Sequence, residues 1–225
     1  MNNIFDRSIG LLGEENFNLI QDKVIAVFGL GGVGGTALEA LARTGFKNFI
    51  LIDFDKVDPS NLNRQILYTS KDIGRNKVDA AKERILSINN KANVQTYNLK
   101  AQDFDFIQKI DFIVDAIDDV EGKLFILKKV QELSIPSIMS LGMANRFDPS
   151  KVKIAKLNQT HSDPLAKKIR YLAKQEDLDL SKISVVISEE LPQKNGEKLY
   201  STMMVPSSAG LSIAKYILEC IIDRK

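Results

Sequence analysis

Hydrophobic and polar positions follow two different periods along this chain. Short apolar runs rich in β-branched residues predict buried strands, and apolar positions three and four apart predict helices. The predicted strands cover residues 24–28, 49–53, 94–99, 112–119, 135–142, 152–157, 183–188 and 199–205, with a hairpin suggested at Asn195-Gly196. The predicted helices cover about 33–44, 77–89, 122–133, a stretch opened by Asp163-Pro164, and 207–222.

Strands that alternate with helices indicate a fold class. They predict a Rossmann-like, doubly wound α/β fold with a mostly parallel sheet, additional C-terminal strands and a closing helix. We expect a single domain over residues 1–225, with an N-terminal arm (1–22), a nucleotide-binding core (23–142) and a C-terminal part (143–225). The arm is expected to be helical from about Glu14, and it carries Arg7, which composition alone would make a solvated surface charge.

One stretch joins a strand to a helix through glycine. The apolar run 24–28 stops at Gly29, and Gly29, Gly31 and Gly34 form a G-x-G-x-x-G pattern. Such glycines let the backbone turn sharply and approach a phosphate, and the amides of the helix N-terminus face the anion. A tight glycine turn without a ligand is the alternative. The motif alone leaves NAD, FAD and ATP open as the nucleotide.

Two acids follow the next strand. Asp53 ends this strand about twenty residues after the glycines, where a ribose-binding carboxylate belongs. We expect Asp55 to face the opposite way; it is a second candidate nucleotide-binding residue, and holding the following loop is its alternative role. Asp53 is therefore the predicted ribose ligand.

A polar stretch, residues 56–68, lies beside the predicted nucleotide site and has no regular period. A loop of this length next to a site is more often functional than idle. Asn61, Arg64 and Gln65 can donate hydrogen bonds to phosphate oxygens. Arg64 adds charge and the planar, two-pronged geometry that suits phosphate.

Lys77 begins the predicted helix 77–89. A cation in the first turn of a helix is mildly unfavourable against the helix dipole. A phosphate bound nearby would explain its position, and an ordinary exposed lysine is the alternative.

Three acids, Asp115, Asp118 and Asp119, follow the apolar run that begins at Phe112. In a doubly wound sheet the carboxyl ends of the strands meet at one rim, so these acids come to the side of the glycine loop. A carboxylate there can bind Mg²⁺ that bridges to nucleotide phosphates, the role we predict for Asp118. Capping of the helix 122–133 is the alternative for Asp118 and Asp119.

Composition sets the remaining limits. Hydrophobic residues make up 44% of the 225 positions and charged residues 27%, which is typical of a globular protein, and the net charge of +2 by itself gives no argument for nucleic acid. Cys220 is the single cysteine, so the chain can form no internal disulfide and no cysteine zinc site, and we expect it buried in the closing helix. No signal core or membrane span is found, so a reducing cytoplasmic location is expected.

The helix after Asp163-Pro164 carries a basic face. It contains Lys167, Lys168, Arg170 and Lys174. Such a face can contact RNA phosphates, and an ordinary solvated helix face is the alternative.

Together these motifs resemble the ubiquitin-activating-enzyme-like superfamily, which includes the adenylating enzymes for sulfur-carrier proteins. Within it the chain is most similar to the tRNA threonylcarbamoyladenosine dehydratases. The superfamily marks are Arg7, the glycines Gly29, Gly31, Gly32 and Gly34, then Asp53-x-Asp55, Ser60-Asn61-x-x-Arg64-Gln65, Gly74-x-x-Lys77 and Asp115-x-x-Asp118. The dehydratase marks are Gly10-Leu-Leu-Gly13, Asp148-Pro149, residues 163–170, Ser188-Glu189 and residues 205–210.

The resemblance implies ATP and Mg²⁺ as cofactors and a modified tRNA as substrate. It implies catalytic roles for Arg7, Arg64, Lys77 and Asp118, with Asp118 on the metal. Arg7 would reach the ATP of a partner subunit in a homodimer, and residues 143–225 would face the substrate and the dimer partner. The implied reaction adenylates the threonyl carboxylate of threonylcarbamoyladenosine and then closes it to the cyclic form.

Two other functions stay open. The chain could adenylate the C-terminus of a small sulfur-carrier protein, with a possible sulfur-relay partner, although relays through a thioester or persulfide need a positioned cysteine. It could also be a non-catalytic nucleotide-binding scaffold, which the complete arginine, lysine and aspartate set disfavours.

Overall fold

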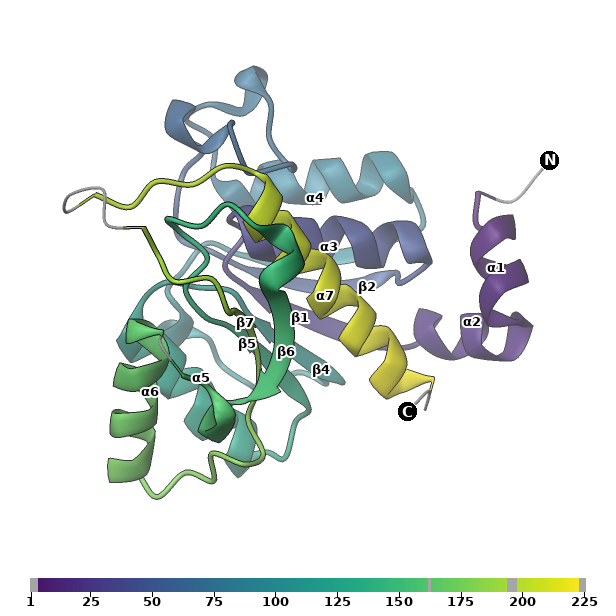
Figure 1. The fold of residues 1–225 in the computed structure, drawn as a ribbon. Helices are drawn as coiled ribbons and strands as arrows, with labels where there is room; N and C mark the ends of the chain where they lie inside the picture. Colours follow the sequence, from purple (N-terminus) through teal and green to yellow (C-terminus); the bar gives the residue numbers. More distant parts are fainter. Residues whose placement is uncertain (1–3, 162, 194–197, 223–225) are drawn as a thin grey trace.

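The computed structural model describes residues 4–161, 163–193 and 198–222, and Figure 1 shows one central sheet flanked by helices. The strands are β1 Val24–Phe28, β2 Asn48–Ile52, β3 Asn93–Tyr97, β4 Phe112–Asp115, β5 Ser137–Ser140, β6 Val152–Lys156 and β7 Ser184–Ser188. The helices are α1 Asp6–Leu12, α2 Glu14–Gln21, α3 Gly32–Thr44, α4 Lys77–Ile88, α5 Val120–Glu132, α6 Pro164–Gln175 and α7 Met204–Ile221.

The sheet has the order β3-β2-β1-β4-β5-β7-β6. Every neighbouring pair is parallel except β6 with β7, which is antiparallel. The β3-β2-β1-β4-β5 part is the order of a doubly wound nucleotide-binding sheet, in which ligands bind at the carboxyl ends of the strands. The fold class predicted from the sequence is confirmed.

Alternate residues of β1 point to opposite faces of the sheet, and each face is covered by helices. Ile25 and Val27 pack into the core cluster that contains α3, α4 and α7, whereas Ala26 and Phe28 pack into the cluster that contains Ile126 of α5. All four side chains are fully buried. A strand covered on both faces must be apolar at every position, which is why β1 reads as a continuous hydrophobic run.

The closing helix α7 packs directly on α3. A Cβ atom on Gly210 would lie 2.5 Å from the carbonyl oxygen of Val33 and 2.7 Å from Cβ of Thr36, so only glycine allows this approach. Pro206, near the start of α7, lies against Gly32 at the other end of the contact. The first turn of α7 therefore supports the back of the glycine loop.

Two sequence predictions about the C-terminal part are wrong. Residues 199–205 form no strand: Tyr200 exchanges backbone and side-chain hydrogen bonds with Asn145, a loop residue, and α7 already begins at Met204. Cys220 is exposed rather than buried, because the last turn of α7 emerges from the core and its residues 218–221 are all at least partly exposed. The suggested Asn195-Gly196 hairpin lies outside the described residues.

The N-terminal arm is helical over more of its length than predicted, because α1 precedes α2. Phe17 of α2 packs against Gly45, where a Cβ atom would lie 2.3 Å from its ring. Asn48, at the start of β2, donates a hydrogen bond to the carbonyl of Gln21. The arm therefore lies at the amino end of β2. Across the described ranges, no helix combines the length and apolar character that crossing a membrane requires.

Candidate active site

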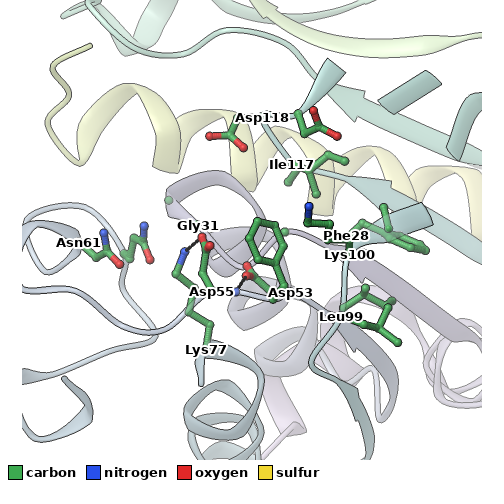
Figure 2. Close-up of a pocket in the computed structure, with 18 of the residues that line it drawn as sticks. Phe28, Gly31, Asp53, Asp55, Asn61, Lys77, Leu99, Lys100, Ile117 and Asp118 are labelled. Atoms are coloured by element: carbon green, nitrogen blue, oxygen red, sulfur yellow. Dashed lines mark hydrogen bonds and ion pairs between the residues drawn. The ribbon is translucent and has the colours of Figure 1, made fainter. Parts of the chain in front are cut away.

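A cavity of about 530 Å³ opens at the carboxyl ends of β1, β2 and β4 (Figure 2). This volume is within the range of small-molecule and cofactor sites. Ten of the twelve residues for which the sequence predicts a catalytic, nucleotide-binding or metal-binding role line it: Gly29, Gly31, Gly32, Asp53, Asp55, Asn61, Arg64, Gln65, Lys77 and Asp118. Asp119 lines it as well. Gly34 and Arg7 are not among its lining residues.

The glycines of the loop have different tasks. Gly29 has a φ of +87°, and a Cβ atom there would lie 2.7 Å from the carbonyl carbon and oxygen of Ala116. Gly34 lies inside the first turn of α3, where a Cβ atom would lie 1.9 Å from the carbonyl oxygen of Gly29. These two glycines allow close backbone packing. Gly31 and Gly32, which border the cavity together with Gly29, lie at the N-terminus of α3, where the helix amides lack intrahelical partners.

Asp53 fastens the glycine loop to the end of β2. Its carboxylate accepts hydrogen bonds from the amide of Leu30 at 2.7 Å and from the amide of Asp55 at 2.9 Å. Burial raises the pKa of Asp53, and the charge of Lys77 and the two amides oppose that rise. Both of its oxygens are therefore engaged by the backbone at the edge of the cavity that the predicted ribose would occupy.

Asp55 and Lys77 form an ion pair inside the cavity. The Lys77 Nζ atom lies 2.7 Å from an Asp55 carboxylate oxygen, and only 7% of the lysine side chain is exposed. The expectation that Asp53 and Asp55 face opposite ways is wrong. Strand β2 ends at Ile52, before both acids, and both line the cavity. Figure 2 shows Lys77 pointing toward Asp55 beside Gly31.

The stretch after β2 is built around a short 3₁₀ turn, Pro59–Asn61. Asp58 caps this turn by accepting from the amide of Ser60 at 2.8 Å. The Nη1 atom of Arg64 donates to the carbonyl of Ser60 and to Asn63. Because these bonds engage only Nη1, the other guanidinium nitrogens can donate to a ligand in the cavity.

Gln65 gives independent evidence for a polar ligand. Its side chain is buried, and its Oε1 atom has no hydrogen-bond partner among the described residues. An unsatisfied buried amide costs about 1–3 kcal/mol. Because Gln65 borders the cavity, a ligand that donates a hydrogen bond from a hydroxyl or amino group would remove that cost. A nucleotide carries both kinds of group.

The loop between β4 and α5 carries two neighbouring acids, Asp118 and Asp119, that have different roles. Asp119 is the N-cap of α5, because its carboxylate accepts a hydrogen bond from the amide of Gly122 at 2.7 Å. This bond lowers the pKa of the Asp119 carboxyl, and a hydrogen bond from Gln102 lowers it further. Asp118 is exposed and lines the cavity, and no hydrogen bond or ion pair holds its carboxylate within the described part of the chain. Of the two predicted roles, helix capping is therefore observed for Asp119. The carboxylate of Asp118 takes no part in the cap and is open to a ligand.

Sequence reasoning missed a buried ion pair beneath this loop. Lys123 of α5 is fully buried, and its Nζ atom lies 2.8 Å from a carboxylate oxygen of Asp115. Burial raises the pKa of Asp115, and Lys123 opposes that rise. Asp115 also accepts from the amide of Ile117 at 3.3 Å. The pair thus ties the first residues of the loop to α5.

The cavity also has an apolar side and a basic rim that the sequence did not reveal. Phe28, Leu99 and Ile117 give it an apolar wall, which suits the faces of a purine base. Lys100 lies at the rim, with its ammonium 5.7 Å from the centre of the Phe54 ring. Lys100 follows the end of β3, so the strand-end rule that found Asp118 could have found it.

Arg7 lies exposed on α1, in the arm. The arm packs at the amino end of β2, whereas the cavity lies at its carboxyl end. The structure therefore does not bring Arg7 to the cavity of its own chain.

A search of protein families matches residues 5–186 to the ThiF family. The chain belongs to the ThiF family. Proteins similar to this ThiF chain include the tRNA threonylcarbamoyladenosine dehydratases of Bacillus subtilis, 36% identical over 84% of this chain, and of Escherichia coli, 35% identical over 74% of it. The alignments span 75% and 63% of those two proteins.

A comparison with solved structures also finds a tRNA threonylcarbamoyladenosine dehydratase similar to this ThiF protein. The crystal structure of the E. coli tRNA N6-threonylcarbamoyladenosine dehydratase in complex with ATP has a TM-score of 0.91 and 29% identity. The match covers 98% of this chain and 94% of that one. A second structure of the same E. coli protein contains AMP.

The residues at the cavity fit both ATP and Mg²⁺. The loop amides, Arg64 and Lys77 suit a polyphosphate, and the open amide of Gln65 suits the nucleoside. Mg²⁺ commonly binds through one or two carboxylates together with substrate phosphates, so a dedicated cluster of acids is not needed. Asp118, with its unengaged carboxylate, is suited to that task.

Proposed function

We propose that this protein is an ATP-dependent tRNA threonylcarbamoyladenosine dehydratase, an adenylating enzyme that closes the threonylcarbamoyl side chain of a tRNA adenosine into a ring. The observation that carries the proposal is the cavity, which gathers a glycine loop, Arg64, Lys77 and Asp118, whose carboxylate has no partner among the described residues, around one space. The relatives that carry the dehydratase name support the substrate.

The first step is adenylation. A carboxylate oxygen of the threonyl group attacks the α-phosphorus of ATP, the bond to the bridging oxygen breaks, and pyrophosphate leaves. Negative charge grows on the phosphate oxygens during this step. Arg64 and Lys77 stabilise that charge, an effect worth about 10²–10³ in rate for a single well-placed donor.

The ion pair with Asp55 prepares Lys77 for this role. It fixes the ammonium group in one place before ATP arrives, so that little reorganisation is needed during the reaction. Asp118 would hold Mg²⁺, which would supply further charge neutralisation at the phosphates when bound.

The second step is ring closure. A nucleophile in the carbamoyl part of the same side chain attacks the activated carbonyl carbon, and AMP leaves with the former carboxylate oxygen. Both reacting groups belong to one nucleoside, so proximity lowers the barrier without any enzyme nucleophile. This agrees with the absence of cysteine from the cavity, since Cys220 lies near the opposite end of α7 from the glycine loop.

We infer a homodimer in which Arg7 acts on the ATP of the partner subunit. The support is geometric, because the arm lies away from the cavity of its own chain while Arg7 is exposed. A two-fold dimer would supply one arm to each cavity. The proposal also places the protein in the cytoplasm and includes a sulfur-relay protein as a partner.

The test is pyrophosphate release from ATP with purified protein, with and without tRNA that bears threonylcarbamoyladenosine. We expect release that depends on the modified tRNA, formation of AMP and of the cyclic nucleoside, and a loss of about 10²-fold or more in Asp118→Ala. Asp105→Ala is the matched control, because Asp105 is exposed and is not among the residues that line the cavity, so its loss should leave the rate nearly unchanged.

Two results would overturn the proposal. Stimulation by a carrier protein ending in Gly-Gly, and none by the modified tRNA, would indicate the adenylyltransferase of a sulfur carrier. ATP binding without any turnover on either acceptor would indicate a scaffold.

A further inference from the structure

Helix α6 is unusual in the charge that it carries. Its twelve residues include four cations and no acid, in a chain with a net charge of only +2. Lys167, Lys168 and Lys174 are exposed, and none of them forms an ion pair within the described ranges, although many other surface lysines, such as Lys128 and Lys215, do. Within the part of the chain that the structure describes, these three lysines are therefore free of carboxylate partners.

An aromatic ring lies among these lysines. Tyr171 is 63% exposed and is four residues after Lys167 and three before Lys174. Residues with this spacing lie on one face of a helix, so Lys167 and Lys174 share the face that carries the ring. The opposite face, with Ala166, Ile169 and Ala173, is buried against the core. The helix thus presents a basic face with an exposed aromatic ring.

The helix is also held firmly at its start. Asp163 caps it by accepting from the amide of Ala166 at 2.8 Å and pairs with Arg146 at 3.0 Å, with both charged side chains buried. Arg146 in turn donates to the carbonyl of Gly142, just after β5, and to that of Glu190 at 2.8 Å. The first turn of α6 is therefore fixed to the carboxyl end of the sheet, the rim at which the cavity opens.

We propose that the face of α6 formed by Lys167, Lys168, Tyr171 and Lys174 binds the phosphate backbone of the substrate RNA. Lysines without partners supply the sequence-independent attraction to phosphate, and an exposed tyrosine can stack on an unpaired base or pack on a sugar. The rigid attachment of α6 fixes this face relative to the rim of the cavity. This inference rests on the proposed function, because it assigns a surface to the tRNA substrate.

The test is the affinity of the full-length protein for tRNA that bears threonylcarbamoyladenosine, measured by filter binding over a range of salt concentrations. We expect Lys167→Glu/Lys174→Glu to weaken binding by roughly tenfold or more at about 0.1 M salt. The slope of log Kd against log salt should fall by about 1 for each lost phosphate contact. Tyr171→Ala should weaken binding with little change in that slope.

The matched control reverses the charge of two lysines at the amino end of the sheet, opposite the rim of the cavity. Lys91 and Lys109 are exposed and lie before β3 and β4, at their amino ends. Lys91→Glu/Lys109→Glu changes the net charge by the same amount and should leave tRNA affinity and slope close to those of the wild type. The neutral variant Lys167→Gln/Lys174→Gln should weaken binding less than the charge reversal, because it removes attraction to phosphate without adding repulsion.

The outcomes separate this inference from the proposed function. Equal weakening by both charge reversals, or no weakening by either, would overturn the role of α6, even in an enzyme that cyclises tRNA. If the α6 reversal instead weakened stimulation by a carrier protein and not by tRNA, the inference would also be wrong. An enzyme inactive on modified tRNA would overturn the proposed function itself.

Discussion

The Nζ atom of Lys123 lies 2.8 Å from a carboxylate oxygen of Asp115, and both side chains are buried beneath the loop that carries Asp118. The other carboxylate oxygen of Asp115 has no partner among the described residues. A buried pair of this kind is weak evidence for stability, since apolar residues of similar volume often serve as well. Its position suggests that it orients the loop.

Lys123→Met should destabilise the protein by about 3–5 kcal/mol, because it leaves the Asp115 charge buried without a partner. Asp115→Leu/Lys123→Met should recover most of that free energy. Urea unfolding measures both variants. If the pair orients the loop, kcat of the double variant stays low while its stability returns. Recovery of kcat together with stability would contradict this positioning role.

Two glycines with nearly equal backbone angles provide a matched pair. Gly29 and Gly74 have φ values of +87° and +86°, but a Cβ atom would meet the backbone of Ala116 at the first and open space at the second. Gly74→Ala should cost about 1 kcal/mol of stability. Gly29→Ala should cost roughly 3 kcal/mol or more and should weaken ATP binding, since overlap adds to the backbone strain. Equal costs in thermal or urea unfolding would show that the close packing has no effect.

The cap at Asp119 predicts a dependence of stability on pH. Its pKa is held below the usual 3.8, chiefly by the amide of Gly122, so its contribution is complete above pH 3.8 and is lost as pH falls below that value. Asp119→Ala should be less stable than the wild type by about 1 kcal/mol at neutral pH. The difference should close as the pH falls below 3.8. A difference that persisted unchanged in acid would contradict the charged cap.

The role of Arg7 can be tested by mixing two inactive variants. If Arg7 acts on the partner subunit, a mixed dimer of Arg7→Ala and Arg64→Ala contains one complete site and one doubly defective site. Random pairing should then restore about a quarter of the wild-type activity. Activity that remained absent after the chains had exchanged would place both residues in the site of one chain. Subunit exchange is verified by native mass spectrometry.

How far the sequence predicts this structure depends on how local each signal is. The strand, glycine turn and helix at residues 24–44 are encoded by neighbouring residues, and their positions are confirmed within one residue. The false strand at 199–205 has the residue types of a strand, yet Leu199 is 80% exposed and the segment pairs with Asn145. Local pattern cannot reveal that the edge position of the sheet is already occupied by β6.

The candidate site also contains residues that local sequence signals predict and residues that only the packed fold reveals. The strand-end rule located Asp53, Asp55 and Asp118, because it depends only on where apolar runs stop. Lys123 stayed hidden, since a lysine in an amphipathic helix is ordinarily assigned to the solvated face. Its burial depends on Asp115, eight residues earlier on another element, and that contact exists only after packing.

The contact of Gly210 and Pro206 with α3 has a consequence for the order in which this protein matures. Helix α3 and its glycine loop leave the ribosome well before α7, the helix that supports them, has been translated. A nascent chain therefore exposes its phosphate-binding loop without the layer behind it. We expect ATP binding to arise only after α7 has left the exit tunnel and packed on α3.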